Sequence, residues 1–282
     1  MSQPNFTTAR QIEGYSQISE KVLGQASIIR SVANLEVEGT PGFTTVKVYV
    51  NDLATIDDYV PGTGLAVSAD GSGYVDINNL KEKAINELLD GYTVDTAPAD
   101  LVASRLEAAL VQMGEQIDKD ALAQLVADGT EAVAVGGAKP VVGTIYADIL
   151  NLKKALDEAK APREGRFLIV TPEMENLLLN TDSKVVLNTQ RGDAIIADGF
   201  IGRVAGFDVF STVLLPAGTN LVAGQRRGFA FKEGWKIPPR RQNLDGSGTF
   251  IGDSAVQGRI AYVYGAVRPT LLQVHNGVGA QA

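Results

Sequence analysis

The segment from residue 97 to residue 128 constrains this sequence most, because its pattern indicates one long amphipathic helix. Its apolar side chains recur at steps of three and four, the spacing of a single helix face. They are Val102, Leu106, Ala109, Met113, Ile117, Ala121 and Leu125. Asp95 or Thr96 can cap the start, Pro98 suits the first turn, and Gly129 follows the end. At about 1.5 Å per residue the helix is roughly 45 Å long, so we expect it to be the spine of the fold.

Two segments predict long ribbons that cannot fold alone. The stretch FTTVKVYV at Phe43–Val50 alternates apolar and polar residues as a strand does, and YVDI at Tyr74–Ile77 indicates its return strand. A second ribbon is predicted in residues 227–269, where RIAYVYGAV at Arg259–Val267 alternates and NLDGSGT at Asn243–Thr249 forms the tip. Since a two-stranded ribbon is marginally stable in water, we expect both ribbons to lie on a neighbour, within this chain or on another.

Two further segments have weaker patterns. Residues 1–42 carry too few apolar side chains to build a core locally, so we expect an arm that packs onto something else. The stretch LKEKAINELLDGYTV at Leu80–Val94 is ambiguous, because Leu80, Ala84 and Leu88 fit a helix whereas the flanking β signals favour a strand. Periodicity alone does not decide between the two.

Residues 144–180 predict a compact section in which helices and strands alternate. A helix begins after Thr144 as its cap and is stopped by Pro162. Its buried stripe is Ile145, Ile149, Leu152 and Leu156. RFLIV at Arg166–Val170 indicates a buried strand, and a second helix follows with Thr171 as its N-cap and Pro172 in its first turn.

The stretch GFIGRVAGFDVFSTVLLPAGTN at Gly199–Asn220 is rich in glycine and valine and has no histidine or cysteine. We expect Gly202 and Gly206 to permit a tight turn and a close approach of strands. Val204, Phe207 and Val209 are predicted to be buried, and Pro216–Gly218 to turn the chain into the next strand. The stretch therefore predicts framework and no catalytic site.

Composition excludes several classes of protein. The net charge of −8 argues against a nucleic-acid-binding domain, which would present a basic face. The chain has no cysteine, so disulfides, thiolate nucleophiles and cysteine-bound zinc are excluded. It contains no signal peptide pattern and no apolar run long enough for a membrane span. With one histidine, a histidine triad and a two-histidine metal site are also excluded.

The single histidine and two basic clusters are the polar candidates that remain. We expect His275 to lie at the surface or in an interface near the C-terminus. The clusters QRR at Gln225–Arg227 and PPRR at Pro238–Arg241 have two interpretations. Their guanidiniums can meet carboxylates of another subunit, or they can keep an exposed strand edge soluble, and the sequence does not choose.

Taken in order, these segments resemble the major capsid proteins, or coat proteins, of tailed bacteriophages over essentially the whole chain. The resemblance rests on DYVPGT at Asp58–Thr63, on the spine helix at Ala97–Gly129 and on PREGRFLIVTPEMENLLL at Pro162–Leu179. It is also carried by IGRVAGFDVFSTVLLPAG at Ile201–Gly218 and QGRIAYVYGAVRPTLLQV at Gln257–Val274. Its specificity lies in the order and spacing of these segments, since no single one is diagnostic.

The resemblance implies an α+β chain with the tailed-phage major capsid protein fold. It implies an N-terminal arm in residues 1–42 and an extended hairpin loop in residues 43–80. The implied peripheral domain comprises residues 81–136 and 229–266 and carries the spine helix at 97–128. The implied axial domain is a compact α/β domain of residues 137–228 and 267–282. In this arrangement LKEKAINELL is a strand that leads to the spine.

The resemblance also implies where subunits touch. The ribbon at Phe43–Ile77 would lie across the neighbouring subunit, the axial domain at the capsomer centre, and the tip at Asn243–Thr249 near the local three-fold axis. We therefore expect assembly contacts at Val46, Val48, Tyr49, Tyr59, Pro61, Arg226, Arg227, Arg240, Arg241 and Asp245.

The function implied by the resemblance is structural and not enzymatic. Subunits would assemble through hexamers and pentamers into an icosahedral shell enclosing the phage genome, in the host cytoplasm and then as the virion capsid. Because the chain starts at the arm, the resemblance implies a separate scaffolding protein or prior cleavage. The other implied partners are a portal protein and double-stranded DNA enclosed without sequence-specific binding. We expect no membrane, cofactor or metal. The alternatives are an encapsulin-type nanocompartment shell protein and a small α/β enzyme that uses carboxylates alone.

Overall fold

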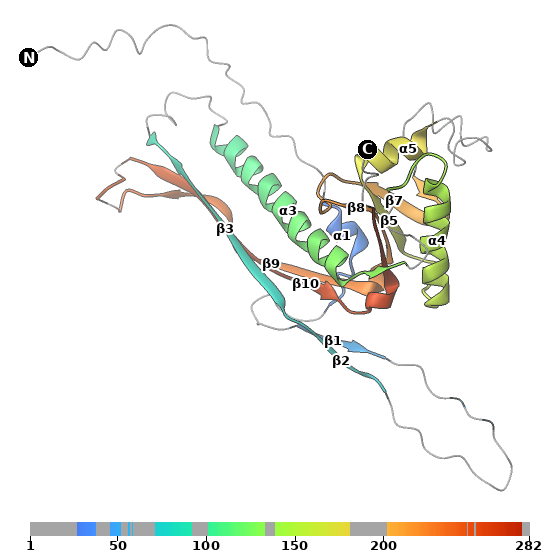
Figure 1. Ribbon diagram of the computed structural model, residues 1–282. Helices are drawn as coiled ribbons and strands as arrows, with labels where there is room; N and C mark the ends of the chain where they lie inside the picture. The colour runs from blue at the N-terminus through green and yellow to red at the C-terminus, as the bar shows by residue number, and fades with distance from the viewer. Residues whose placement is uncertain are drawn as a thin grey trace, which may run out of the picture. The chain divides into compact units, whose positions relative to one another are not determined.

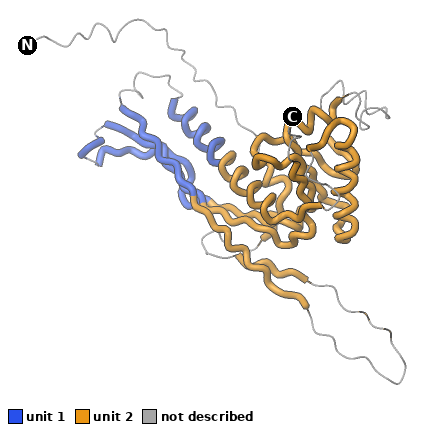
Figure 2. Tube along the Cα trace, viewed as in Figure 1, with its two compact units in different colours: residues 1–24, 83–113, 235–260 blue, residues 25–82, 114–234, 261–282 orange. Residues whose placement is uncertain are grey.

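The structure of the protein is a computed structural model. It describes residues 27–37, 46–51, 56, 58, 71–91, 101–132, 139–180, 202–246, 248–250 and 252–277. The chain divides into two compact units (Figure 2). Unit 1 comprises residues 1–24, 83–113 and 235–260, of which 1–24 lie outside the described residues. Unit 2 comprises residues 25–82, 114–234 and 261–282.

The predicted spine is helix α3, Leu101–Asp128, and its apolar stripe is confirmed (Figure 1). The stripe is buried from Ala109 to Leu125 and half-buried at Val102 and Leu106. The helix ends at Asp128, directly before Gly129, as expected. A Cβ on Gly129 would lie 2.4 Å from Val274 Cγ2, so only glycine fits at this position without a shift of the Val274 side chain. Residues 92–100, with the predicted cap, lie outside the described residues.

A three-stranded sheet, in the order β3–β10–β9, contributes to both units. Its strands are β3 (Asn79–Leu89), β9 (Phe229–Asn243) and β10 (Ser254–Ala266). The ambiguous segment at Leu80–Leu89 is thus a strand, as the resemblance implied. The amide of Leu244 donates to the Asp253 carbonyl at 3.0 Å and closes the β9–β10 ribbon near the predicted tip.

Unit 1 has a small core of its own. Leu89 of β3, Ala109 of α3 and Val256 of β10 are buried together. Ile85, Val102 and Leu106 are partly buried against them. Polar contacts add to this packing, since Arg105 pairs with Glu87 and Gln257 Nε2 donates to Asn86 Oδ1 at 3.0 Å.

Unit 2 contains a six-stranded mixed sheet in the order β4–β11–β8–β5–β7–β6. These strands are β4 (Thr130–Glu131), β5 (Arg166–Val170), β6 (Arg203–Val204), β7 (Phe207–Ser211), β8 (Thr219–Gln225) and β11 (Leu272–Asn276). β5 is parallel to β7 and antiparallel to β8, and β11 is antiparallel to β8 and parallel to β4. Every residue of β5 and β8 is buried, whereas the edge strands β4 and β6 have two residues each.

Two helices lie over one face of this sheet, α4 (Ile145–Glu158) and α5 (Pro172–Leu179) (Figure 1). The predicted α4 stripe is fully buried. It packs with Leu168 and Val170 of β5 and with Leu221 and Ala223 of β8 in one apolar cluster. The alternating section predicted from residues 144–180 is therefore confirmed.

Thr144 occupies the predicted N-cap position of α4, but its side chain does not cap the helix, and Pro162 is not what stops it. The backbone of Thr144 is already helical, with φ −108° and ψ −26°, and its side chain makes no cap hydrogen bond. Its hydroxyl instead accepts a bond from the amide of Val141 at 3.1 Å. The helix ends four residues before Pro162, at a turn where Lys160 adopts φ 55° and the Ala161 amide donates to the Leu156 carbonyl at 2.9 Å. This left-handed closure, and not the proline, stops the helix.

The glycine-rich stretch forms framework, as its sequence indicates. Ala205 and Gly206, with φ 50° and 93°, make a two-residue turn between β6 and β7. Positive φ at both positions is the requirement of a type I′ hairpin. Val204 and Phe207 are buried and Val209 is half-buried, while Gly218 (φ 89°) turns the chain into β8. Residues 199–201 lie outside the described residues.

The N-cap predicted for α5 is confirmed. Thr171 has an extended backbone and its hydroxyl accepts from the Met174 amide at 3.5 Å, with Pro172 in the first turn.

The first ribbon is also confirmed. Strands β1 (Val46–Val50) and β2 (Gly73–Ile77) are antiparallel, with Val46 opposite Ile77 and Val50 opposite Gly73. Val46 and Ile77 are buried in a cluster with Val37, Ala230, Val263 and Val267. The base of the ribbon is therefore held by its own chain.

A buried carboxylate fixes the start of the described chain. Asp118 of α3 is 2% exposed, and it accepts hydrogen bonds from Ser27 Oγ and from the Ile28 amide, both at 2.7 Å. The short helix α1, Ile29–Val32, begins directly after these donors. Burial raises the pKa of Asp118, and the two hydrogen bonds oppose that shift. On the next residues of α1, Arg30 makes a two-bond ion pair with Glu233, at 2.8 Å for each bond.

Replacing Asp118 with alanine should lower the free energy of unfolding by about 2 kcal/mol, because the buried Ile28 amide and Ser27 hydroxyl lose their acceptor. Urea denaturation measures this loss. Trypsin should also cut faster after Arg30. Ser27→Ala removes one of the two bonds and should cost about half as much. Equal unfolding midpoints for the wild-type and Asp118→Ala proteins would show that the carboxylate does not anchor α1.

Candidate assembly surfaces

The described residues contain no group of three or more His, Cys, Asp or Glu side chains that could hold a metal ion. No helix among them has the length and apolar character needed to cross a bilayer. The prominent features of this part of the chain are instead uncovered apolar and charged side chains. They occur on the β1–β2 ribbon, at a turn after β8, and toward the end of the β9–β10 ribbon.

The β1–β2 ribbon has one covered and one open face. Val46 is 3% exposed and Val48 is half-buried, so both contribute to the cluster of their own chain. On the other face, Tyr49 is 50% and Tyr74 67% exposed, and their rings meet edge to face with centroids 5.1 Å apart. Of the three residues predicted here as assembly contacts, Tyr49 alone is largely open. Tyr74, its partner, was missed because the sequence does not give the cross-strand register.

Between the two strands, Ile56 and Asp58 are described and both are exposed. Ile56 is 93% exposed, which is unusual for a large aliphatic side chain, and Asp58 is also exposed. The predicted contacts Tyr59 and Pro61 lie outside the described residues. An uncovered isoleucine next to an uncovered carboxylate is consistent with a segment that is buried by another molecule.

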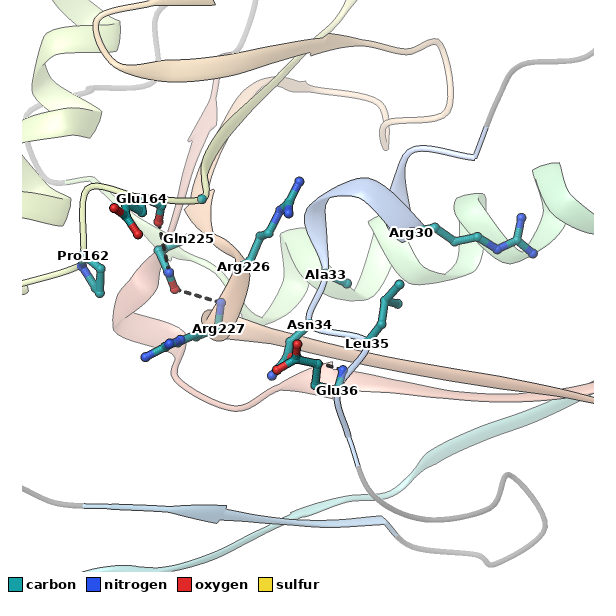
Figure 3. Close-up of a pocket in the computed structure, with 11 residues that line it drawn as sticks. Arg30, Ala33, Asn34, Leu35, Glu36, Pro162, Glu164, Gln225, Arg226 and Arg227 are labelled. Carbon is teal, nitrogen blue, oxygen red and sulfur yellow. Dashed lines mark hydrogen bonds between the residues drawn. The ribbon is translucent and has the colours of Figure 1, made fainter.

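The first arginine cluster is built on a rigid turn. The 3₁₀ turn η2, Arg226–Gly228, follows β8, and the buried side chain of Gln225 accepts from the Arg227 amide at 2.8 Å. The Arg226 amide donates to the Gly165 carbonyl at 3.1 Å. Gly228 is packed against Leu271 and Leu272, where a Cβ would lie 3.0 Å from Leu271 Cβ. Both arginine side chains are exposed and extend from the turn in different directions (Figure 3).

A pocket of about 460 Å³ opens beside this turn (Figure 3). Its walls come from the chain around α1 and from the loop before β5 as well as from η2. The lining includes Arg30, Leu35, Glu36, Pro162, Glu164, Arg226 and Arg227. A second pocket of about 410 Å³ shares Asn34, Glu36, Pro162, Gln225 and Arg227 with the first and adds Tyr49 and Arg268. The sequence suggested the arginines, and only the fold shows that they line a cavity.

Near the end of the β9–β10 ribbon, the predicted contact residues Arg241 and Asp245 form hydrogen bonds within the ribbon itself. Arg241 Nε donates to Ser254 Oγ at 3.1 Å, while Arg240 is exposed. Asp245 is held by Asn243 Nδ2 and accepts from the Gly252 amide at 3.1 Å, so its carboxylate organises the turn. Trp235, Ile237 and Phe250 are 38%, 39% and 37% exposed. They were not singled out from the sequence, although Trp235 and Ile237 alternate on one strand and so share a face.

The prediction for His275 is wrong. The side chain is 1% exposed, because β11 lies between β4 and β8 in the sheet. Its Nδ1 has no hydrogen-bond partner among the described residues. Burial lowers the pKa of His275, and the nearby charges of Asp148 and Glu131 oppose this only in part. His275 is thus a core side chain.

The comparison with protein families identifies the class. A family model described as phage capsid protein matches residues 91–273, well over half of the 282 residues. The chain belongs to this phage capsid protein family. No curated protein matches it.

Solved structures show the same fold. A chain from Mycobacterium phage Che8 has a TM-score of 0.77 at 22% identity, over 93% of this chain and 96% of that one. A chain from the capsid of Cyanophage P-SCSP1u has a TM-score of 0.77 at 13% identity, over 97% and 94%. A chain from the mature capsid of bacteriophage PhiM1 has a TM-score of 0.71 at 14% identity, over 96% and 93%.

The chain is accordingly a phage capsid protein, a structural subunit of the phage shell and of the virion capsid. Its α+β architecture is the fold of these phage capsid chains, as the resemblance implied. No finding favours the encapsulin-type alternative.

His275 supplies a pH test of unit 2. Its pKa is lowered in the fold, so below about pH 6.5 the unfolded state binds a proton that the folded state does not. The free energy of unfolding should then fall as the pH drops from about 6.5 toward the folded pKa, by up to about 1.4 kcal/mol per pH unit. Urea denaturation of the wild-type and His275→Gln proteins between pH 7 and 5 measures this, because the chain has no other histidine. The same slope in both proteins would refute the assignment.

Proposed function

We propose that this chain assembles through hexamers and pentamers into an icosahedral shell around the phage's double-stranded DNA. Assembly would take place in the host cytoplasm, and a separate scaffolding protein and a portal protein would be its partners. The shell subunit would act without catalysis.

One observation carries this proposal, the near-complete exposure of Ile56 at 93%. Burying an isoleucine side chain contributes roughly 1.5–3 kcal/mol of favourable free energy. The isolated subunit lacks this contribution because Ile56 is exposed. Tyr49 and Tyr74 on the same ribbon are also half or more exposed. A ribbon with uncovered apolar groups gains its packing when another subunit lies against it.

Unit 1 supports the same conclusion. One apolar cluster in this unit consists of three buried residues and three partly buried ones. Leu88, Leu110, Trp235, Ile237 and Phe250 remain more than a third exposed in this unit. Obligate interfaces of 2,000 Å² or more cover side chains of this kind. We propose that contacts between subunits complete the packing of unit 1.

The proposed domain roles follow the boundaries given by the sequence resemblance. Residues 1–42 would be the arm and residues 43–80 the extended loop. Residues 81–136 and 229–266 would form the peripheral domain, and residues 137–228 and 267–282 the axial domain at the capsomer centre. The assembly contacts would include Val48, Tyr49, Arg226, Arg227, Arg240 and Arg241, with Tyr59 and Pro61 from the extended loop.

The enclosed DNA would be held without sequence-specific contacts. The net charge of −8 opposes tight binding to phosphates. The shell would therefore act as a container for the genome.

Electron microscopy of the expressed protein, alone and together with the scaffolding protein, tests assembly. We expect hexamers, pentamers or closed shells in at least one of these preparations. A monodisperse monomer in all of them, including at high protein concentration, would refute the proposal.

The ribbon offers a second test. Replacing residues 51–72 with Asn-Gly keeps Val50 opposite Gly73 through a two-residue turn. The shortened subunit should fold with an unchanged unfolding midpoint, because the cluster around Val46 is intact, but it should fail to close shells. Circular dichroism and electron microscopy measure the two properties. Normal shells from the shortened protein would show that the middle of the ribbon has no role in assembly.

A further inference from the structure

We propose that Asn276–Gly277 is a deamidation site, and that the end of the β8–β11 strand pair keeps it unreactive until that end opens. An asparagine followed by glycine occurs once in the 282 residues, at this position. The inference is independent of the proposed assembly, because it concerns the chemistry of one peptide unit within a single folded subunit.

The reaction needs only water as a co-reactant. The Gly277 amide nitrogen loses its proton and forms a bond to the side-chain carbonyl carbon of Asn276. The side-chain nitrogen leaves with that proton as ammonia. Water then opens the resulting cyclic imide at one of its two carbonyls and leaves aspartate or isoaspartate in place of Asn276. Glycine favours the attack because it has no Cβ to crowd the nitrogen.

The fold restrains both reacting groups. The Gly277 amide donates to the Gly218 carbonyl at 3.0 Å, and the reaction consumes the proton of that hydrogen bond. The Thr219 hydroxyl donates to Asn276 Oδ1 at 3.0 Å, which holds the side chain against the partner strand. Asn276 itself is exposed, so water reaches its side chain, whereas Gly277 is buried. The ring therefore cannot close until the Gly277 hydrogen bond is broken.

A β-bulge makes this end of the strand pair easier to open. His275 is opposite Leu221 and Asn276 is opposite Thr219, so Asn220 is an extra residue in β8. A bulge interrupts the ladder of hydrogen bonds between two strands. The Asn220 side chain is 6% exposed, and its Nδ2 has no hydrogen-bond partner among the described residues. A buried amide without a partner destabilises the closed arrangement, and opening this end exposes that amide to water.

The product would mark a subunit that has opened. Both products add a negative charge at the end of β11. Isoaspartate also lengthens the main chain by one carbon atom, so the pairing with Thr219 no longer fits. Deamidation would therefore make a transient opening of this strand end permanent.

Peptide mapping by mass spectrometry measures the reaction. The wild-type protein is kept at mildly alkaline pH, folded in one sample and unfolded in guanidinium chloride in the other. In denaturant, Asn276 should react faster than every other asparagine, because each of those is followed by a residue with a side chain. In the folded protein, its reaction should be at least about tenfold slower. Equal rates in the two samples, or no reaction at Asn276 in denaturant, would overturn the proposal.

Variants of Thr219 test whether this strand end controls the rate. Thr219→Val keeps the shape of the side chain but removes its hydroxyl, and it should speed the reaction of the folded protein about fivefold. The rate in denaturant should not change. Thr219→Ser keeps a hydroxyl and should react like the wild type. Thr130→Val removes a hydroxyl that donates to the Pro269 carbonyl at 3.4 Å, on the other side of β11, and should have no effect. No acceleration in Thr219→Val, or the same acceleration in Thr130→Val, would refute control by this end.

Hydrogen exchange of the wild-type protein gives a measurement that needs no substitution. The Gly277 amide should exchange faster than the hydrogen-bonded amides of β11 that precede the bulge, because the end opens without the rest of the strand. Exchange of Gly277 that is as slow as theirs would show that this end does not open locally, and would overturn the proposal even if a Thr219 variant failed to fold.

Discussion

The buried carboxylate of Asp118 is the interaction on which the arrangement of the chain's first described residues depends. An acidic side chain that is 2% exposed is costly unless donors surround it. Ser27 and the Ile28 amide supply those donors from a segment 90 residues away in sequence. Because this carboxylate lies on α3, its hydrogen bonds attach Ser27 and Ile28 to the spine helix. Arg30 and Glu233 then extend this attachment to β9.

The two units differ in how far they can be stable by themselves. Unit 2 has a wide sheet with fully buried central strands and two covering helices, which is an ordinary self-sufficient core. The apolar cluster of unit 1 is small, and five large apolar side chains of this unit are more than a third exposed. In the proposed assembly, unit 2 would fold first and contacts with neighbouring subunits would complete the packing of unit 1.

Much of the fold follows from local patterns, and the exceptions have identifiable causes. The α3 stripe, the α4 stripe and the Thr171 cap depend on spacing along one segment, and spacing is visible in sequence. Asp118 interrupts an apolar face, and its partners lie far away in the chain, so periodicity could not predict its burial. His275 was placed at the surface because it lies near the chain end. Its burial depends on β11 entering the sheet between β4 and β8, which is a long-range pairing. For the candidate site, the sequence indicated Arg226 and Arg227 but not the pocket, whose walls come from three separate segments.

The outer strands of the six-stranded sheet have a consequence for the crowded conditions in which shell proteins accumulate. β4 and β6 contain two residues each, and each includes a charged one, Glu131 and Arg203. A long, flat outer strand has free amides and carbonyls that can pair with a strand of another copy, which leads to irregular aggregation. A charged strand of two residues has too few free backbone amides and carbonyls for another strand to pair with it. Unwanted strand addition is thereby suppressed on this sheet, and contacts between copies are left to side chains that can discriminate a correct neighbour from a wrong one.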